Sequence, residues 1–196
     1  MRKKILAANW KMNLSYADAQ AWLTEFKSGN GGMHEVEFRL YAPTLYLHDL
    51  AKSEVLSVGA QNVHPSVSGA FTGEVSIPQL ISVGASSVLI GHSERRLYFH
   101  ETNAFLKDKV NACCQQDFSF IFCCGESLET RQSGEHLDFI KGQLEAAILH
   151  LDKAHLPLLT IAYEPIWAIG KSYKEAMSPT DIHETALFIK KSFGEL

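Results

Sequence analysis

Short apolar runs alternate with segments of helical periodicity along the chain, and this alternation constrains the fold more than any other feature. Runs of this length, bounded by turn-forming residues, are typical of strands buried on both faces of a parallel sheet. Six are present, at residues 5–8, 36–43, 55–62, 86–92, 118–125 and 158–165. Because strand–helix alternation implies right-handed crossovers, the sequence predicts an α/β fold with a parallel sheet.

The predicted helices begin at polar residues that cap helix N-termini. Ser15 with Asp18 resembles a capping box, Thr102 is a predicted N-cap, and Ser178 followed by Pro179 begins the last helix. The stretch SGNGG ends the first helix. The predicted helices span residues 15–26, 45–52, 77–83, 102–116, 136–151 and 178–192. Six strand–helix units therefore account for the chain.

Two architectures fit six such units, a doubly wound sheet and a closed barrel. A doubly wound sheet often has a glycine-rich turn after its first strand, but that turn here is NWKMN, without GxGxxG. A barrel instead gathers functional residues at the carboxyl ends of several strands. Asn9 and Lys11 follow the first predicted strand, His92 and Glu94 the fourth, and Glu164 the sixth. This distribution favours the barrel.

Three of these side chains together predict proton abstraction next to a carbonyl group. Glu164, between apolar Tyr163 and Pro165, is the candidate base, because a carboxylate removed from water is a stronger base. His92 precedes a helix, where backbone N–H groups favour a neutral imidazole that can donate a hydrogen bond to a carbonyl oxygen. Lys11 supplies a positive charge for an anionic substrate and a developing oxyanion.

Each of these residues also has an ordinary structural interpretation. Glu164 fits a loop carboxylate, Lys11 a solvated surface charge, and His92 a helix-capping group. Their shared position at strand ends, rather than their identity, favours the catalytic interpretation.

Composition and charge indicate a globular protein that acts on a small soluble partner. The chain has 196 residues, 46% of them hydrophobic, and a formal net charge of -4 without a basic stripe. We therefore expect neither a nucleic-acid nor a membrane partner. The N-terminal residues MRKKILAANWK lack a signal-peptide core and no stretch approaches transmembrane length, which predicts a cytoplasmic location.

The cysteines and histidines do not have the spacing of metal ligands. The four cysteines form two adjacent pairs, Cys113 with Cys114 and Cys123 with Cys124, and neighbouring side chains diverge on strands and helices alike. The nine histidines contain no HxxxH pattern. We expect buried thiols and no metal site.

Several longer motifs resemble the triosephosphate isomerase family. They are AANWKMN, GAQN, SGAFTGE, GHSERR, CGES and AYEPIWAIG, in the family's order and approximate spacing from Met1 to the last helix. The resemblance implies a parallel (β/α)8 TIM barrel. It also implies interconversion of dihydroxyacetone phosphate and glyceraldehyde 3-phosphate through an enediolate, without metal or cofactor. This activity belongs to glycolysis and gluconeogenesis.

The resemblance also implies roles for individual residues. Asn9 and Lys11 of NWK would bind substrate, His92 of GHSERR would polarise the carbonyl, and Glu164 of YEP would move the proton. Gly170 of WAIG would give its backbone N–H to the phosphate from a mobile loop.

Other family positions lie behind the site or at a subunit contact. Glu94 would support Lys11, and Cys123 matches a supporting position, whereas the family more often has an apolar residue where Cys124 stands. Residues 61–74 resemble a protruding loop that enters a twin subunit. The resemblance thus implies a homodimer, with Thr72 near the neighbour's site.

The chain departs from the family pattern in two places. After PIWAIG it continues KSYKEAMSP, which is longer than the family loop and lacks its second glycine, so we expect residues 168–177 to be the most mobile segment. The second departure is the number of units, because the family has eight and residues 1–196 contain six. We therefore expect a single TIM-barrel domain that is truncated at its C-terminus, with little isomerase activity if the chain ends at Leu196.

Two other functions fit parts of the sequence. A Schiff-base aldolase of the barrel class would use Lys11 as its nucleophile, which requires a desolvated lysine within the barrel. An inactive six-unit fragment would instead self-associate through open sheet edges.

Overall fold

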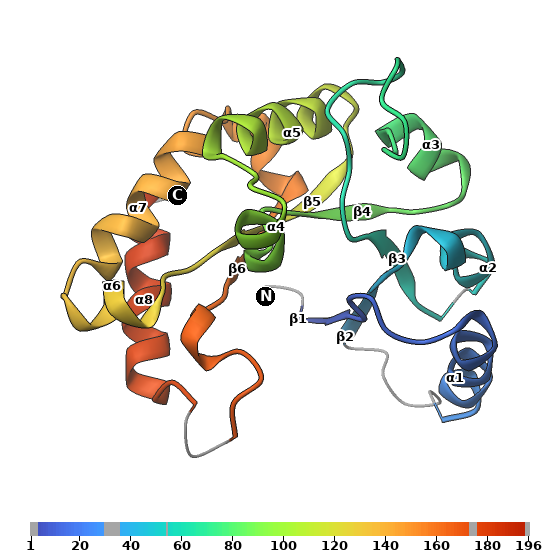
Figure 1. Ribbon diagram of the computed structural model, residues 1–196, viewed down its shortest axis with the longest axis horizontal. Coiled ribbons are helices and arrows are strands. Elements are labelled where there is room, and N and C mark those ends of the chain that lie inside the picture. The colour runs from blue at the N-terminus through green and yellow to red at the C-terminus, as the bar shows by residue number, and fades with distance from the viewer. Residues whose placement is uncertain (1–3, 30–35, 54, 173–175, 195–196) are drawn as a thin grey trace.

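A computed structural model describes residues 4–29, 36–53, 55–172 and 176–194 of the chain. Its sheet has six strands in the order β1-β2-β3-β4-β5-β6, and every neighbouring pair is parallel (Figure 1). The strands are β1 (Lys4–Asn9), β2 (Val36–Ala42), β3 (Ser57–Ala60), β4 (Ser87–Ile90), β5 (Ser119–Cys124) and β6 (Leu159–Tyr163). The predicted parallel α/β fold is confirmed.

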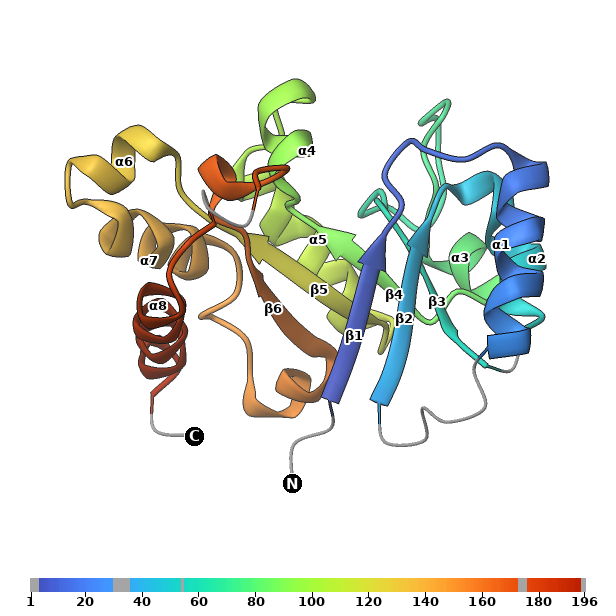
Figure 2. The same cartoon turned by 90° about the horizontal axis from the view of Figure 1, so that it is seen from below.

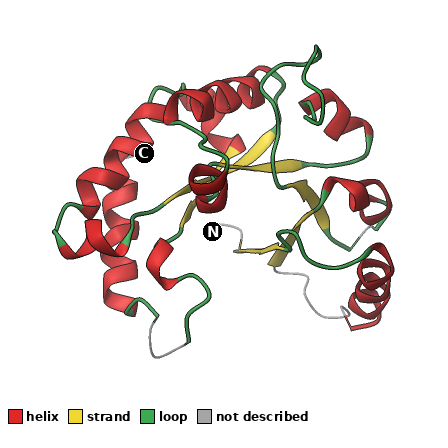
Figure 3. Ribbon diagram, viewed as in Figure 1, coloured by secondary structure: helices red, strands yellow, loops and turns green. Residues whose placement is uncertain are grey.

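Helices surround the outside of this curled sheet (Figure 3). The α-helices are α1 (Tyr16–Gly29), α2 (Leu47–Ala51), α3 (Ile77–Ser82), α4 (Ser93–Tyr98), α5 (Asn103–Gln115), α6 (Leu128–Gln132), α7 (His136–Ala147) and α8 (Pro179–Ser192). Three 3-10 helices are η1 (Thr44–Tyr46), η2 (Lys153–Leu158) and η3 (Ile166–Ala168). Figure 2 shows α4 and η3 beyond the carboxyl ends of the strands, at one end of the partial barrel. None of the helices in the described segments is long and apolar enough to cross a membrane.

The sheet forms part of a barrel whose two outer strands are β1 and β6. Among the described residues, β1 pairs only with β2, and β6 pairs only with β5. All four residues of β4 are buried, whereas the first four residues of β1 are exposed. Burial is thus greatest in the middle strands and decreases toward β1.

Two hydrophobic clusters lie on opposite faces of the strands. The larger cluster packs between the sheet and the helices and includes Leu40, Val88 and Phe120. The smaller cluster consists of Tyr41, Leu89, Ile121 and Cys123, on the inner face of the curve. Successive strand residues point to opposite faces, so Leu40 and Tyr41 belong to different clusters. Burial on both faces explains why the strands are continuous apolar runs.

The predicted helix starts are present in the structure. Ser15 Oγ lies 2.6 Å from Asp18 Oδ2, and the Asp18 N–H donates to Ser15 Oγ. Thr102 accepts a hydrogen bond from the Phe105 N–H, and Ser178 accepts one from the Asp181 N–H. These side chains satisfy N–H groups that have no partner in the first helical turn.

The predicted boundaries differ from the structure in several places. The helix predicted at 136–151 ends at Ala147, and η2 follows it before β6. The short helix α6 was not predicted, and α4 was expected only from the capping position of His92, because five and six residues are too few to show helical periodicity. Of the stretch SGNGG, residues 30–32 lie outside the described segments.

Candidate active site

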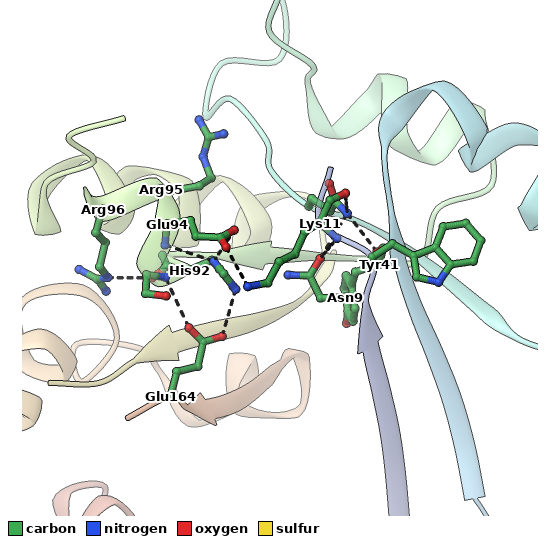
Figure 4. A network of polar contacts seen from close by, with 12 residues as sticks. Asn9, Lys11, Tyr41, His92, Glu94, Arg95, Arg96 and Glu164 are labelled. Carbon is green, nitrogen blue, oxygen red and sulfur yellow. Dashed lines mark hydrogen bonds and ion pairs between the residues drawn. The ribbon is translucent and has the colours of Figure 1, made fainter. Parts of the chain in front are cut away.

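The carboxyl ends of β1, β4 and β6 carry the side chains that line one cavity. Its volume is about 390 Å³, and its lining includes Asn9, Lys11, His92 and Glu164 (Figure 4). Asn9 is the last residue of β1, His92 is the N-cap of α4, and Glu164 follows β6. Side chains separated by up to 155 positions in sequence therefore face the same space.

Lys11 lies in a turn with an unusual backbone. Its φ angle is 53°, in the left-handed region that residues with a side chain rarely adopt. Its N–H donates to Asn9 Oδ1 at 2.8 Å, and its Nζ lies 2.8 Å from Glu94 Oε1. The structure thus places Glu94 beside Lys11. This ion pair joins the end of the Lys11 side chain to α4.

The hydrogen bonds of His92 indicate which ring nitrogen carries the proton. Nδ1 accepts the Glu94 N–H at 3.3 Å, so in a neutral ring the proton is on Nε2. Nε2 lies 3.6 Å from Glu164 Oε1, on the cavity side. His92 therefore caps α4 with one nitrogen and presents an N–H donor to the cavity with the other. The capping and catalytic interpretations are compatible.

Glu164 is held through its backbone and one carboxylate oxygen. Its N–H donates to Cys124 O at 2.8 Å, and Oε2 accepts the Ser93 N–H at 3.4 Å. Only 21% of the side chain is exposed. A Cβ at Gly125 would overlap the carbonyl oxygen of Glu164, so only glycine permits the backbone at residue 125 to approach the backbone at residue 164 this closely. Gln143 Oε1 in turn accepts the Gly125 N–H at 2.9 Å.

The two thiols of β5 face opposite sides of the sheet, but both are protonated. Cys123 lines the catalytic cavity and Cys124 lies in the cluster beneath the helices. Burial raises the pKa of Cys123 well above its usual value, and the negative charge of Glu164 raises it further. Burial raises the pKa of Cys124 to about 12. Both thiols are therefore neutral, apolar parts of the site wall.

The segment after Glu164 covers one side of the cavity and is attached to a buried carboxylate. Ala168 and Ile169 line the cavity, and Gly170 has a φ of 71°. Trp167 Nε1 donates to Glu126 Oε1 at 3.1 Å, and Glu126 is fully buried. Gly170 is not in the cavity lining. Of the segment 168–177 that we expect to be mobile, residues 173–175 lie outside the described residues.

Two residues that sequence reasoning did not single out complete the wall. Tyr41, on the inner face of β2, lines the cavity and hydrogen-bonds Ser87 Oγ at 3.0 Å. Gln61, immediately after β3, lines a smaller adjoining hollow of about 180 Å³ that also contains Lys11, His92 and Glu94. The position of Gln61 at a strand end was the signal that could have identified it.

Thr72 lies away from the catalytic cavity. It is in the loop between β3 and α3 and lines a separate hollow of about 690 Å³. The described side chains contain no group of three or more histidine, cysteine or acidic residues arranged to hold a metal ion.

A curled parallel sheet with a carboxylate, an imidazole and an ammonium group at its carboxyl ends defines a (β/α)-barrel enzyme of the acid–base type. Comparison with known proteins makes this class specific. The family model described as "Triosephosphate isomerase" matches residues 4–196, and the chain belongs to the triosephosphate isomerase family.

Curated relatives support this membership over most of the chain. The triosephosphate isomerase of Flavobacterium johnsoniae is 40% identical over 202 residues, which cover 99% of this chain and 80% of the relative. That of Lactiplantibacillus plantarum is 40% identical over 100% of this chain and 78% of the relative. That of Cytophaga hutchinsonii is 43% identical over 87% of this chain and 69% of the relative.

Proposed function

We propose that this chain interconverts dihydroxyacetone phosphate and D-glyceraldehyde 3-phosphate by proton transfer through an enediolate. The observation that carries the proposal is the common cavity of Glu164, His92 Nε2 and Lys11. The isomerisation oxidises one carbon and reduces its neighbour within the same molecule. It therefore needs a base, a hydrogen-bond donor and a cation, and no cofactor.

Each group has a step that suits its surroundings. Glu164 removes a proton from the carbon next to the carbonyl and returns it to the former carbonyl carbon, while the hydroxyl proton passes from one oxygen to the other. His92 donates its Nε2 hydrogen bond to the oxygen that becomes negative, because Nδ1 is already occupied by the Glu94 N–H. Lys11 and Asn9 bind the substrate, and the ammonium charge stabilises the enediolate. Cys123 packs behind Glu164 and keeps water from that side of the carboxylate.

Closure of the segment after Glu164 would exclude water and bind the phosphate. Ala168 and Ile169 already line the cavity, and Gly170, whose φ is positive, follows them directly in the chain. We infer that the Gly170 N–H reaches the phosphate once this segment closes. A water-excluded site strengthens each charge interaction with the enediolate.

Exposed apolar side chains beside the site support a homodimer. Met12 is 96% exposed and Phe99 is 63% exposed, and both line the hollow that contains Lys11 and Glu94. Large apolar groups at such a place suit a protein contact better than solvent. We infer that a second copy covers them, with Thr72 in its protruding loop. We also propose a small phosphorylated triose as the partner, no nucleic-acid or membrane partner, and a cytoplasmic location.

The ion pair of Lys11 disfavours the aldolase alternative. A Schiff-base lysine must be free to attack a carbonyl carbon, whereas Lys11 Nζ is held in an ion pair with Glu94 Oε1 at 2.8 Å. Its side chain is also 34% exposed, so it is not the desolvated lysine that this chemistry requires.

An isomerase assay of the purified chain with D-glyceraldehyde 3-phosphate tests the proposal. Glu164→Gln should lower turnover about a thousandfold or more, and His92→Gln about a hundredfold or more. Glu145→Gln, at an exposed position on α7, is the matched control and should leave turnover unchanged. A Glu164→Gln variant with a tenth of the wild-type activity would remove the base from its role. A folded wild-type chain without activity would support the inactive fragment instead.

A further inference from the structure

The side chain of Gln61 connects the carboxyl ends of three strands. Gln61 follows β3, and its Nε2 lies 2.8 Å from Lys11 O, 3.2 Å from Asn9 Oδ1 and 3.2 Å from Tyr41 O. These acceptors belong to the ends of β1 and β2 and to the turn after β1. An amide nitrogen has two hydrogens, so at least one of them is shared among the three acceptors.

The contact at Lys11 O bears directly on an unusual backbone. A lysine in the left-handed region keeps that conformation only where its surroundings hold it. Asn9 Oδ1 accepts the Lys11 N–H, and Gln61 donates to the Lys11 carbonyl. Gln61 also donates to the same Asn9 oxygen. Both peptide groups of Lys11 are therefore attached to Gln61, one directly and one through Asn9.

We propose that Gln61 is a positioning residue that aims the ammonium group of Lys11 into the active site through the Lys11 backbone. This inference rests on the proposed function, in which Lys11 binds an anionic substrate. A neutral amide suits the task because it donates to three oxygens without adding a second positive charge beside Lys11. Gln61 also begins the loop that carries Thr72, so the same side chain connects that loop to the catalytic lysine.

Steady-state kinetics of three variants separates positioning from simple structural support. Gln61→Met keeps the length of the side chain but cannot donate, and Gln61→Asn keeps the amide but is one methylene shorter. We expect KM to rise about tenfold or more in Gln61→Met, with a smaller fall in kcat, and an intermediate rise in Gln61→Asn. Gln116→Met, at an exposed position after α5, is the control and should change KM less than about twofold.

A second measurement does not depend on turnover. Amide hydrogen exchange at Trp10, Lys11 and Asn13 should become faster in Gln61→Met than in wild type, while exchange within β4 stays the same. If the wild-type chain has no isomerase activity, the proposed function fails and this measurement alone decides the role of Gln61.

Two results would overturn the inference. One is a Gln61→Met variant whose KM and exchange at Lys11 match those of wild type. The other is a variant with lower kcat, unchanged KM and faster exchange throughout the sheet, because that pattern shows a loss of folded protein.

Discussion

The four thiols of this chain differ in how easily they ionise, although they occur as two adjacent pairs. Cys113, Cys123 and Cys124 are buried, whereas Cys114 is half-buried. Burial raises the pKa of Cys113 and of Cys124 to about 12, and it raises the pKa of Cys114 as well. Because the thiolate is the reactive form, burial and protonation both protect Cys113, Cys123 and Cys124 from thiol reagents.

We therefore predict stepwise reaction with a thiol reagent such as dithionitrobenzoate at pH 8. Cys114 should react first in the folded protein, and the other three should react only after unfolding. Cys114→Ser should remove the first phase and leave the later phase unchanged. Rapid reaction of all four thiols without denaturant would contradict the buried environment of Cys123.

The pKa of Cys124 also predicts how stability depends on pH. Its folded value of about 12 lies above its usual value of 9.0, so the unfolded chain loses this proton first as pH rises. The contribution to stability is complete below about pH 9 and is lost between pH 9 and 12. The free energy of unfolding can be measured with urea at pH 8, 9.5 and 11 for the wild-type protein and for Cys124→Val. It should fall less steeply with pH in the variant, by up to about 1.4 kcal/mol per pH unit. Cys114→Val, at the half-buried position, should change the slope less.

At the scale of elements, the segment that follows β6 is attached to the buried carboxylate of Glu126. Glu126 accepts hydrogen bonds from Tyr163 Oη at 3.0 Å and from Trp167 Nε1 at 3.1 Å. Its backbone oxygen also accepts the Ile166 N–H. Arg131 Nη1 lies 3.8 Å from the same carboxylate, and Arg131 Nη2 lies 3.4 Å from Asp181 on α8. Residues 168–177 are called the lid below. The carboxylate of Glu126 connects the segment that leads into the lid to α6 through Arg131, and Arg131 in turn contacts α8.

Limited proteolysis tests this attachment. Trp167→Phe removes the indole donor while keeping an aromatic ring, so the lid should open more often and cleavage within 168–177 should be faster, by about threefold to tenfold. Substrate-like anions should slow cleavage in both proteins. Trp22→Phe, in the aromatic cluster on α1, is the control and should leave cleavage at the lid unchanged. First cleavage near residues 28–32, unaffected by anions, would contradict lid closure.

The sequence was sufficient for the elements but not for their contacts. Apolar runs and capping residues located all six strands and six of the helices, since burial on two faces and unsatisfied helix N–H groups leave local traces. The approach of Glu164 to Gly125 and the three acceptors of Gln61 left no such trace. These contacts depend on how strands lie side by side, which one-dimensional patterns do not encode. Residue chemistry alone could not separate Lys11, His92 and Glu164 from ordinary loop residues. Their shared position at strand ends made them candidates, and the family motifs agreed with that choice.

At the scale of the whole molecule, the strands differ in how well they are protected. β4 is buried throughout, whereas Ile5 and Leu6 of β1 are 38% and 48% exposed. Each outer strand has a single strand neighbour among the described residues. An edge strand loses its hydrogen bonds by separating from one neighbour only, so opening costs less there than in the middle of the sheet.

Native-state hydrogen exchange should reproduce this order. In a polypeptide of residues 1–196, amides of β1 and β6 should exchange at least about tenfold faster than those of β4 and β5, with β2 and β3 between them. Sedimentation at several concentrations should accompany the measurement, because pairing of edges between copies would protect β1 and β6 selectively. Equal protection of all six strands at low concentration would show that the edges are not the weaker part of the sheet.

The unequal protection of the strands has a consequence for the distances between reacting groups. Cys123 lies in β5 and His92 follows β4, two buried middle strands, whereas Lys11 and Glu164 follow the two outer strands. Any separation of β1 from β6 would change the distance from Lys11 to Glu164 and leave the surroundings of His92 nearly constant. A triose that contacts both Lys11 and Glu164 would be bound most tightly when the distance between these two residues is shortest. Substrate would then act as a brace between the residues that follow β1 and β6, and its binding energy would set the working geometry of the charged groups.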